Sequence, residues 1–342
     1  MGTSPLLRVE ALRTVVQSAG ADQVVVDCVD LDVEAGETVA LVGESGSGKS
    51  MTALSIARLL ARNVRTASGR VLLDGQDLLA LSPNALKSMR GRGFAMVFQE
   101  PMTSLNPVLT IGTQLTEAVR LRPEAGMSRR QQAVTLLDSV GIAEPQRRVD
   151  QYPHQLSGGM RQRVMVAIAI AAHPRLLIAD EPTTALDVTT QAQILDLIRL
   201  RVTENRTALL LITHDMGLVA RYAQRVNVMY AGTIVERASA SALFSRPSHP
   251  YTRGLLASVP RLDRERQRRL PAIEGLPPSL TDRPSGCSFR PRCTFSIDRC
   301  AEKPLLSEVA PGHMAACWRA TEVAAMSAEP RVKTPDFVAD GV

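Results

Sequence analysis

Three short apolar runs indicate where the buried strands of this chain lie. They are ETVALV at residues 37–42, LLIAD at residues 176–180 and ALLLIT at residues 208–213. The first run leads through a glycine-rich turn into a helix-compatible stretch from Lys49 to Leu60, which predicts strand, loop and helix. The other two runs are too apolar for strands with one face in water, so we expect parallel strands buried inside an α/β fold.

The pattern changes along the chain, and the changes suggest domain boundaries. Residues 101–162 are rich in turn residues, Met, Gln and amphipathic stretches, so a helical subdomain is expected at about residues 100–164. The main domain is expected at residues 1–246, followed at residues 247–320 by an extension in which proline and cysteine are more frequent. Residues 321–342 offer little to bury and are expected to be disordered.

Chain length and the apolar runs limit the roles of the five cysteines. At 342 residues the chain can bury a proper core and does not need disulfides merely to fold. The amino terminus lacks a secretory signal pattern, and the longest apolar run, residues 164–172, is too short to cross a bilayer. A cytoplasmic location is therefore expected, where reduced thiols favour metal ligation over disulfides.

The net charge of +6 and the pI of about 9.4 could indicate a nucleic-acid or membrane partner. However, the 40 basic residues comprise 36 arginines and four lysines, a bias more typical of a GC-rich genome than of a binding surface. The dense basic run, residues 261–269, also contains two acids and lacks aromatic residues for stacking on bases. We interpret it as a solvated linker and expect no nucleic-acid partner.

The segment GESGSGKS, residues 43–50, fits a phosphate-binding loop between a buried strand and a helix start. Gly46 and Gly48 would adopt backbone conformations closed to other residues, so that N–H groups face a polyphosphate. Lys49 would reach the β- and γ-phosphates, and Ser50 would ligate Mg²⁺. The full set of residues expected to contact the nucleotide here is Gly43, Ser45, Gly46, Gly48, Lys49, Ser50 and Met51.

Acidic residues end the strand predicted at residues 176–180. Asp180 is expected to help hold Mg²⁺ and Glu181 to act as the base toward the attacking water. Taken alone, these two acids could also be ordinary surface residues at a strand end, a reading that the nearby glycine-rich loop disfavours. His214, just after another predicted strand, could contact the γ-phosphate, although a lone histidine there is more often structural.

A further motif, LSGGMRQR at residues 156–163, distinguishes the chain from kinases and small GTPases that share the glycine-rich loop. It resembles the signature motif of ATP-binding cassette (ABC) ATPases. Ser157 and the backbone of Gly158 and Gly159, at a helix start, would offer a second anion site. Since the glycine-rich loop covers only one side of a nucleotide, a second subunit must supply this site, and two subunits would enclose two ATP molecules.

The resemblance to ABC ATPases covers nearly all of residues 6–318. Gln99 in VFQEPMTSLNP matches the Q-loop of the family, and Asp187 matches its D-loop, which crosses the dimer interface. The resemblance implies that Gln99 senses Mg²⁺ and water, while its loop contacts a transmembrane partner, and that His214 acts on the γ-phosphate. It also implies a P-loop (RecA-like) core with a mixed β-sheet, a helical subdomain and a carboxyl-terminal Cys-rich extension.

One position departs from the family pattern. ABC ATPases usually carry an aromatic residue before the first core strand, where it stacks on adenine. The equivalent position here is Val16, and Phe94 and Phe98 are the only aromatic residues before Tyr152. Adenine is therefore expected to pack on Val16 or on a residue from elsewhere.

Residues 246–260, RPSHPYTRGLLASVP, and the later GCSFRPRC resemble the carboxyl-terminal extension of ATPase subunits of oligopeptide and dipeptide import permeases. The tetrapeptide HPYT, residues 249–252, is predicted to be a turn entering a helix, and the sequence gives it no chemical role. The resemblance implies that the chain powers uptake of peptides from the cytoplasmic face of the inner membrane as a peripheral subunit. Its implied partners are a second ATPase subunit, two transmembrane permease subunits and an extracytoplasmic substrate-binding protein.

Four cysteines of this extension are candidate metal ligands: Cys287, Cys293, Cys300 and Cys317. Their spacing fits neither zinc ribbons nor ferredoxins, and four thiolates suit Zn²⁺ or an iron-sulfur cluster about equally. The family resemblance favours a 4Fe-4S cluster with a structural role, and arginines at positions 290, 292 and 299 would offset its charge. Cys28, which stands apart from the others, is expected to be a core residue.

Two other functions remain open at this point. One is a soluble ABC ATPase acting on ribosomes or nucleic acid, although a single cassette without heptads is atypical of that group. The other is a metal-binding scaffold with a vestigial nucleotide site. The cargo, whether dipeptides, longer peptides, or nickel and metallophore complexes, and the choice between homodimer and heterodimer are not determined by these residues.

Overall fold

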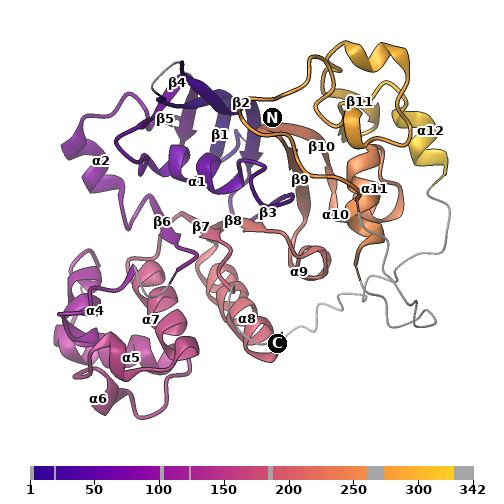
Figure 1. Ribbon diagram of the computed structural model, residues 1–342. Coiled ribbons are helices and arrows are strands. Elements are labelled where there is room, and N and C mark those ends of the chain that lie inside the picture. Colours follow the sequence, from indigo (N-terminus) through magenta and orange to yellow (C-terminus); the bar gives the residue numbers. More distant parts are fainter. Residues whose placement is uncertain are drawn as a thin grey trace.

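The computed structural model describes residues 4–18, 21–100, 104–122, 125–183, 188–259 and 273–326. Its centre is a sheet with the strand order β11-β12-β10-β9-β3-β8-β7-β6 (Figure 1). The strands are β3 (Thr38–Val42), β6 (Phe94–Val97), β7 (Leu176–Asp180), β8 (Ala208–Thr213), β9 (Arg225–Tyr230), β10 (Thr233–Ser239), β11 (Ser307–Ala310) and β12 (His313–Ala315). The five strands from β9 to β6 run parallel, which confirms the three strands predicted from apolar runs.

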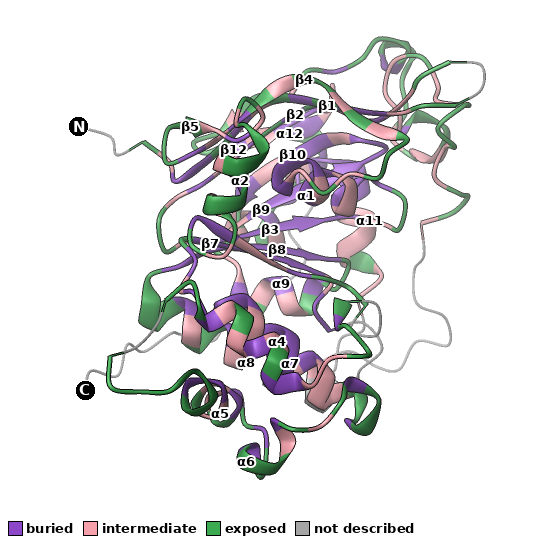
Figure 2. Ribbon diagram, turned by 90° about the vertical axis from the view of Figure 1, so that its left-hand side faces the viewer, coloured by how far each residue is buried: buried purple, intermediate pink, exposed green. Residues whose placement is uncertain are grey.

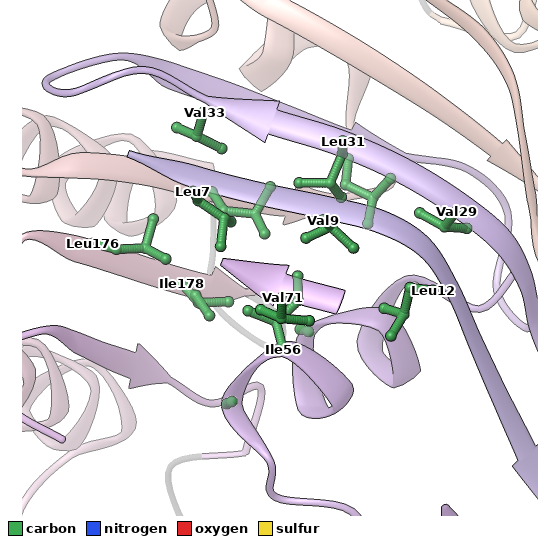
Figure 3. Packing of buried hydrophobic residues seen from close by; sticks show 14 of the residues in the cluster. Leu7, Val9, Leu12, Val29, Leu31, Val33, Ile56, Val71, Leu176 and Ile178 are labelled. Carbon is green, nitrogen blue, oxygen red and sulfur yellow. The ribbon is translucent and has the colours of Figure 1, made fainter. Parts of the chain in front are cut away.

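A second, antiparallel sheet covers one face of the first. It contains β1 (Leu7–Val16), β2 (Gln23–Val33), β4 (Val64–Leu73) and β5 (Gln76–Asp77). Helix α1 (Lys49–Ala57) contributes Ile56 to the core between the two sheets, where Leu7 and Val71 meet Ile178 (Figure 3). This helix ends three residues earlier than predicted, because Arg58 adopts a left-handed backbone conformation.

Helices α7 (Gly158–Ile170) and α8 (Val188–Asn205) lie on the other face of the large sheet, where they share a second core with β7 and β8. Helices α4 (Ile111–Val119), α5 (Arg129–Ser139) and α6 (Pro145–Arg148) lie beyond them, with α4 and α5 packed against α7 and α6 against α5, while α2 (Pro83–Met89) lies near β6. The described residues from 104 to 170 contain helices joined by turns and loops, and no strand. Buried strands and more exposed outer helices are distinguished in Figure 2.

The carboxyl-terminal part of the chain joins the large sheet. Helices α9 (Met216–Tyr222), α10 (Ala240–Ser245) and α11 (Pro250–Ala257) flank β9 and β10, and α12 (Ala320–Ala325) follows β12. Strand β12 pairs with β10, and β11 pairs with β12, so the extension adds two strands to the sheet that carries the glycine-rich loop. Residues 321–325 of the expected disordered tail instead lie in α12. The basic run at residues 261–269 and residues 327–342 lie outside the described residues.

Cys28 is exposed, so its prediction as a core residue was wrong. The pairing of β1 with β2 is irregular here, with Leu12 opposite Val29 and Thr14 opposite Val26. Cys28 takes a φ of 50° within this irregularity, and such a bulge turns side chains out of the regular alternation.

No helix in the described part of the chain is long and apolar enough to span a bilayer.

Candidate nucleotide site and cysteine pocket

The glycine-rich loop of residues 43–50 connects β3 to α1. Lys49 is 4% exposed, and its Nζ donates hydrogen bonds to the carbonyl oxygens of Gly43 at 2.8 Å and Glu44 at 3.0 Å. Burial lowers the pKa of Lys49, while the carboxylates of Glu181 and Asp180 act to raise it. The loop therefore surrounds a largely desolvated lysine that has acidic groups nearby.

At two crowded positions of this loop, the backbone leaves room for glycine but not for a residue with a Cβ. Gly43 has a φ of +154°, and a Cβ there would lie 2.2 Å from the carbonyl oxygen of Met229. Gly48 has a φ of +105°, and a Cβ there would lie 3.1 Å from the carbonyl oxygen of Val25. Side chains at either position would displace the loop.

A buried hydroxyl in the loop fits an anionic ligand. Ser47 is 3% exposed, and its Oγ has no hydrogen-bond partner among the described residues. A buried hydroxyl without a partner is costly, and a phosphate oxygen would satisfy it. Ser45 and Gly46 are exposed at the tip of the loop, where a ligand could reach them. The side chain of Met51 instead packs against the first core.

Ser50 and Asp180 form a pair suited to Mg²⁺. The Oγ of Ser50 donates to Oδ1 of Asp180 at 3.0 Å, which joins the start of α1 to the end of β7. Asp180 is 5% exposed, and burial is the main reason its pKa is raised. A hydroxyl and a carboxylate are hard oxygen ligands of the kind Mg²⁺ prefers, so the donor set fits the predicted ion.

Glu181 lies between the other two predicted catalytic residues. Gln99 Nε2 donates to one carboxylate oxygen of Glu181 at 3.2 Å, and His214 Nδ1 lies 3.2 Å from the other. These residues follow β6, β7 and β8, which are parallel neighbours, so their carboxyl ends meet at one edge of the sheet. Glu181 has a φ of 44°, a strained conformation of the type that concentrates at functional sites.

The signature residues lie in the helical subdomain. Ser157 caps α7, where its side chain accepts a hydrogen bond from the backbone N–H of Met160 at 3.3 Å. Ser157 and Gly158 are exposed and Gly159 is half-buried, so this helix start is accessible to another molecule. Asp187 lies outside the described residues.

Val16 ends β1 and is half-buried against the first core. That adenine packs on Val16 stays a prediction.

One contact near Glu181 was not predicted from the sequence. Gln162, in α7, is fully buried, and its Nε2 donates to the carbonyl oxygen of Pro182. This bond ties the signature helix to the segment just after Glu181. The available signal was a polar residue preceding the apolar run of α7, but the sequence could not identify a partner 20 residues away.

The four cysteines of the extension line one small cavity, together with residues that include Phe289, Trp318 and Arg319. Burial raises the pKa of the thiols of Cys287, Cys293 and Cys317, in the case of Cys317 to about 11. Within the described residues, however, no group of three or more His, Cys, Asp or Glu side chains is arranged to hold a metal ion. The predicted metal site is therefore not supported by the positions of the thiols.

The three expected counter-charges around the cysteines are also only partly available. Arg292 forms an ion pair with Glu44 in the glycine-rich loop, and Arg299 stacks on Trp318 at 3.8 Å from the ring centre. Arg319 lines the cavity, where burial raises the pKa of Cys293 and the positive charge of Arg319 acts to lower it. Because Arg292 pairs with Glu44, it does not line the cavity.

Comparison with protein families gives two matches on this chain. The family described as ABC transporter matches residues 26–184. The family described as Oligopeptide/dipeptide transporter, C-terminal region, matches residues 235–300, which include the HPYT segment and three of the clustered cysteines.

Similar proteins agree with these matches. The "Probable peptide ABC transporter ATP-binding protein y4tR" of Sinorhizobium fredii is 54% identical over 86% of this chain and 89% of its own length. The "Dipeptide transport ATP-binding protein DppD" of Escherichia coli is 47% identical over 91% of this chain and 96% of its own length. Among solved structures, the dimeric ATP-binding cassette MJ0796 bound to ADP and Pi is 28% identical, with a TM-score of 0.61 over 68% of this chain and 98% of that one.

Proposed function

This chain belongs to the family of ATP-binding proteins of peptide ABC transporters, and we propose that it hydrolyses ATP to power the import of peptides across the cytoplasmic membrane. The observation that carries the proposal is that Lys49, Ser50, Asp180 and Glu181 lie together at the carboxyl ends of neighbouring parallel strands of the large sheet. The peptide cargo is proposed from the names of the chain's relatives.

The roles of the loop residues follow from their charges and positions. Lys49, held by two loop carbonyls, would exchange these contacts for the β- and γ-phosphates of ATP. Ser50 and Asp180 would hold Mg²⁺, which supplies positive charge against the phosphate oxygens. Asp180 would then remain ionised, because a nearby cation favours the carboxylate over the protonated form.

Glu181 would accept the proton of the attacking water, and its neighbours would hold it in place. Gln99 and His214 contact opposite oxygens of its carboxylate, which limits rotation of the group. His214 is 63% exposed, so it can turn from Glu181 toward a γ-phosphate. General-base catalysis by a positioned group contributes about 10²–10⁴-fold in rate.

The second half of the catalytic site is proposed to come from another ATPase subunit. The exposed Ser157 and its glycine neighbours would cover the ATP bound to the partner's loop, and Asp187 would lie at the same interface. ATP binding would then draw the two subunits together, since a ligand shared by both favours the associated state. Closure would be transmitted to two permease subunits that receive cargo from an extracytoplasmic binding protein, with this chain peripheral at the cytoplasmic face.

The experiment that tests this function compares wild type with Glu181→Gln in the assembled transporter. The substitution should abolish phosphate release, retain ATP binding and accumulate an ATP-bound pair of ATPase subunits, detected by size-exclusion chromatography. The matched control is Glu204→Gln, which alters a glutamate of α8 that is 47% exposed and should turn over ATP like the wild type. Unchanged turnover in Glu181→Gln would refute the assignment.

We also propose that the four cysteines hold a metal centre, a 4Fe-4S cluster with zinc as the alternative. The support is that all four thiols line one cavity, although they would have to draw closer and lose their protons. Anaerobic purification of the full-length chain, with iron, sulfide and zinc measured on one sample, tests this proposal. A protein that contains none of the three elements would refute it.

A further inference from the structure

Glu44 adds an acidic side chain to a loop that is proposed to bind phosphates. It follows Gly43 directly and lies close enough to Lys49 to influence its pKa. A free carboxylate here would repel a polyphosphate, and two like charges near a protein surface interact by several kcal/mol at 4 Å. The chain must therefore control the charge of Glu44 if the loop is to bind ATP well.

Arg292 pairs with this carboxylate in the form best suited to neutralise it. Its Nη1 and Nη2 donate to the two carboxylate oxygens of Glu44 at 2.6 Å and 3.0 Å. The side chain of Arg292 is 6% exposed and that of Glu44 is 25% exposed, so water screens the pair only weakly. The guanidinium is fixed further by a bond from its Nε to the carbonyl oxygen of Glu274 at 2.9 Å.

Tyr251 of the HPYT segment fixes the backbone of the same residue. The N–H of Glu44 donates to the hydroxyl of Tyr251 at 2.7 Å, and Tyr251 is fully buried. Its ring packs on Tyr230 and Phe289, with ring centres 4.6 Å and 5.4 Å away. The backbone and side chain of one loop residue are thus both held by the carboxyl-terminal part of the chain.

The HPYT segment is itself anchored to the large sheet. The carboxylate of Glu236 in β10 accepts hydrogen bonds from the backbone N–H groups of Ser248 at 2.6 Å and His249 at 2.9 Å. The side chain of His249 caps α11 by accepting the N–H of Tyr251 at 3.1 Å. These bonds fix the position of Tyr251, and therefore of its hydroxyl, relative to the glycine-rich loop.

We propose that Arg292 and Tyr251 are positioning residues of the nucleotide site, with Arg292 neutralising Glu44 and Tyr251 fixing the start of the glycine-rich loop. The proposal rests on ATP binding by that loop, as proposed above. It gives the HPYT segment a physical role and makes the extension part of the ATP site. Arg292 lies in the turn between Cys287 and Cys293, so order in the cysteine segment and order in the loop depend on each other.

The test measures equilibrium binding of a fluorescent ATP analogue to the full-length chain, with thermal melting of each apo variant. Arg292→Met should weaken binding about tenfold or more, since Glu44 then stays charged and unpaired beside the phosphates. Adding Glu44→Gln to that variant should restore affinity to within about threefold of wild type, because the repulsion is gone. Loss of packing alone could not be repaired by a change at Glu44.

A second variant covers the case in which Arg292→Met does not fold. Tyr251→Phe retains the ring and removes only the hydroxyl, so it should weaken ATP binding about three- to tenfold, the range for one hydrogen bond. In ATPase assays of the assembled transporter, Tyr251→Phe and Arg292→Met should raise KM for ATP more than they lower kcat, since neither touches Glu181.

The outcomes separate this proposal from the function on which it rests. Lys49→Ala should abolish binding, and a wild-type chain that binds no ATP would overturn the proposed function. If wild type binds ATP and both Arg292→Met and Tyr251→Phe bind it equally well, the positioning role alone is overturned. A folded Arg292→Met variant that Glu44→Gln fails to restore would overturn the neutralising role of Arg292.

Discussion

Two regions of the molecule each contain a buried carboxylate, and the two carboxylates differ in their surroundings. One region is the nucleotide edge, where the parallel strands end at Asp180 and Glu181, and the other is the place where β10 holds the HPYT segment of the extension. Asp180, at the end of β7, accepts a hydrogen bond from Ser50, and burial raises its pKa. Glu236, in β10, is fully buried and receives two backbone N–H groups, and His313 Nε2 lies 2.7 Å from one of its oxygens. The first carboxylate is poorly solvated by the protein, whereas the second is well supplied with donors.

The difference indicates what each carboxylate is for. Burying a charge without enough donors costs stability, and such a cost is typical of a group that waits for a cation or substrate. A buried charge with a full set of donors instead holds structure together, and removing it leaves several donors without an acceptor. We therefore expect the same carboxylate-to-amide change to have opposite effects on stability at the two places.

The largest effect is expected for Glu236→Gln. The amide offers one acceptor oxygen where the carboxylate offered two, so the free energy of unfolding should fall by about 3 kcal/mol. Urea unfolding of the full-length chain measures this, with Glu322→Gln, a change at an exposed glutamate of α12, as the matched control. Equal unfolding midpoints for Glu236→Gln and the control would remove the structural half of the comparison.

The rate of thiol modification should distinguish Cys317, in the cavity of the extension, from the exposed Cys28 in β2. After treatment with chelator and reductant at pH 8, iodoacetamide should modify exposed Cys28 about 100-fold faster than Cys317. The pKa of Cys317 is raised to about 11 by burial, so little of it is thiolate at pH 8, and its rate should rise as pH approaches that value. Peptide mass spectrometry follows both sites, and equal rates would show that the cysteine cavity is open.

The smallest effect is expected for Asp180→Asn, and it has the opposite sign. The free energy of unfolding of the apo chain should rise by about 0.5–2 kcal/mol near neutral pH, as is common when a buried functional group is removed, while ATP turnover is lost. The folded pKa of Asp180 is raised, so its ionisation opposes folding above the unfolded value of about 3.9. The gain should therefore grow as pH rises from about 4 and then level off; an Asn variant less stable than wild type at pH 7.5 would contradict this.

Much of the nucleotide edge could be predicted because its signals are local. Strands β3, β7 and β8 follow from short apolar runs, and the residues placed after them meet once the strands pair in parallel. Asp180, Glu181 and His214 were identified from such positions, Lys49 and Ser50 from the glycine-rich loop motif, and Gln99 from the resemblance to the Q-loop. These residues lie at one edge of the sheet.

What the sequence by itself determined was the order of strands, loops and helices and the candidate catalytic side chains at their ends, because these depend on neighbours within a few residues. Only the tertiary structure decided the bulge that exposes Cys28, the addition of β12 to the large sheet and the pairing of Arg292 with Glu44, which are 248 residues apart. Such contacts leave no periodic trace in the chain, since two distant segments meet only after the sheet and the buried aromatic rings have brought them together.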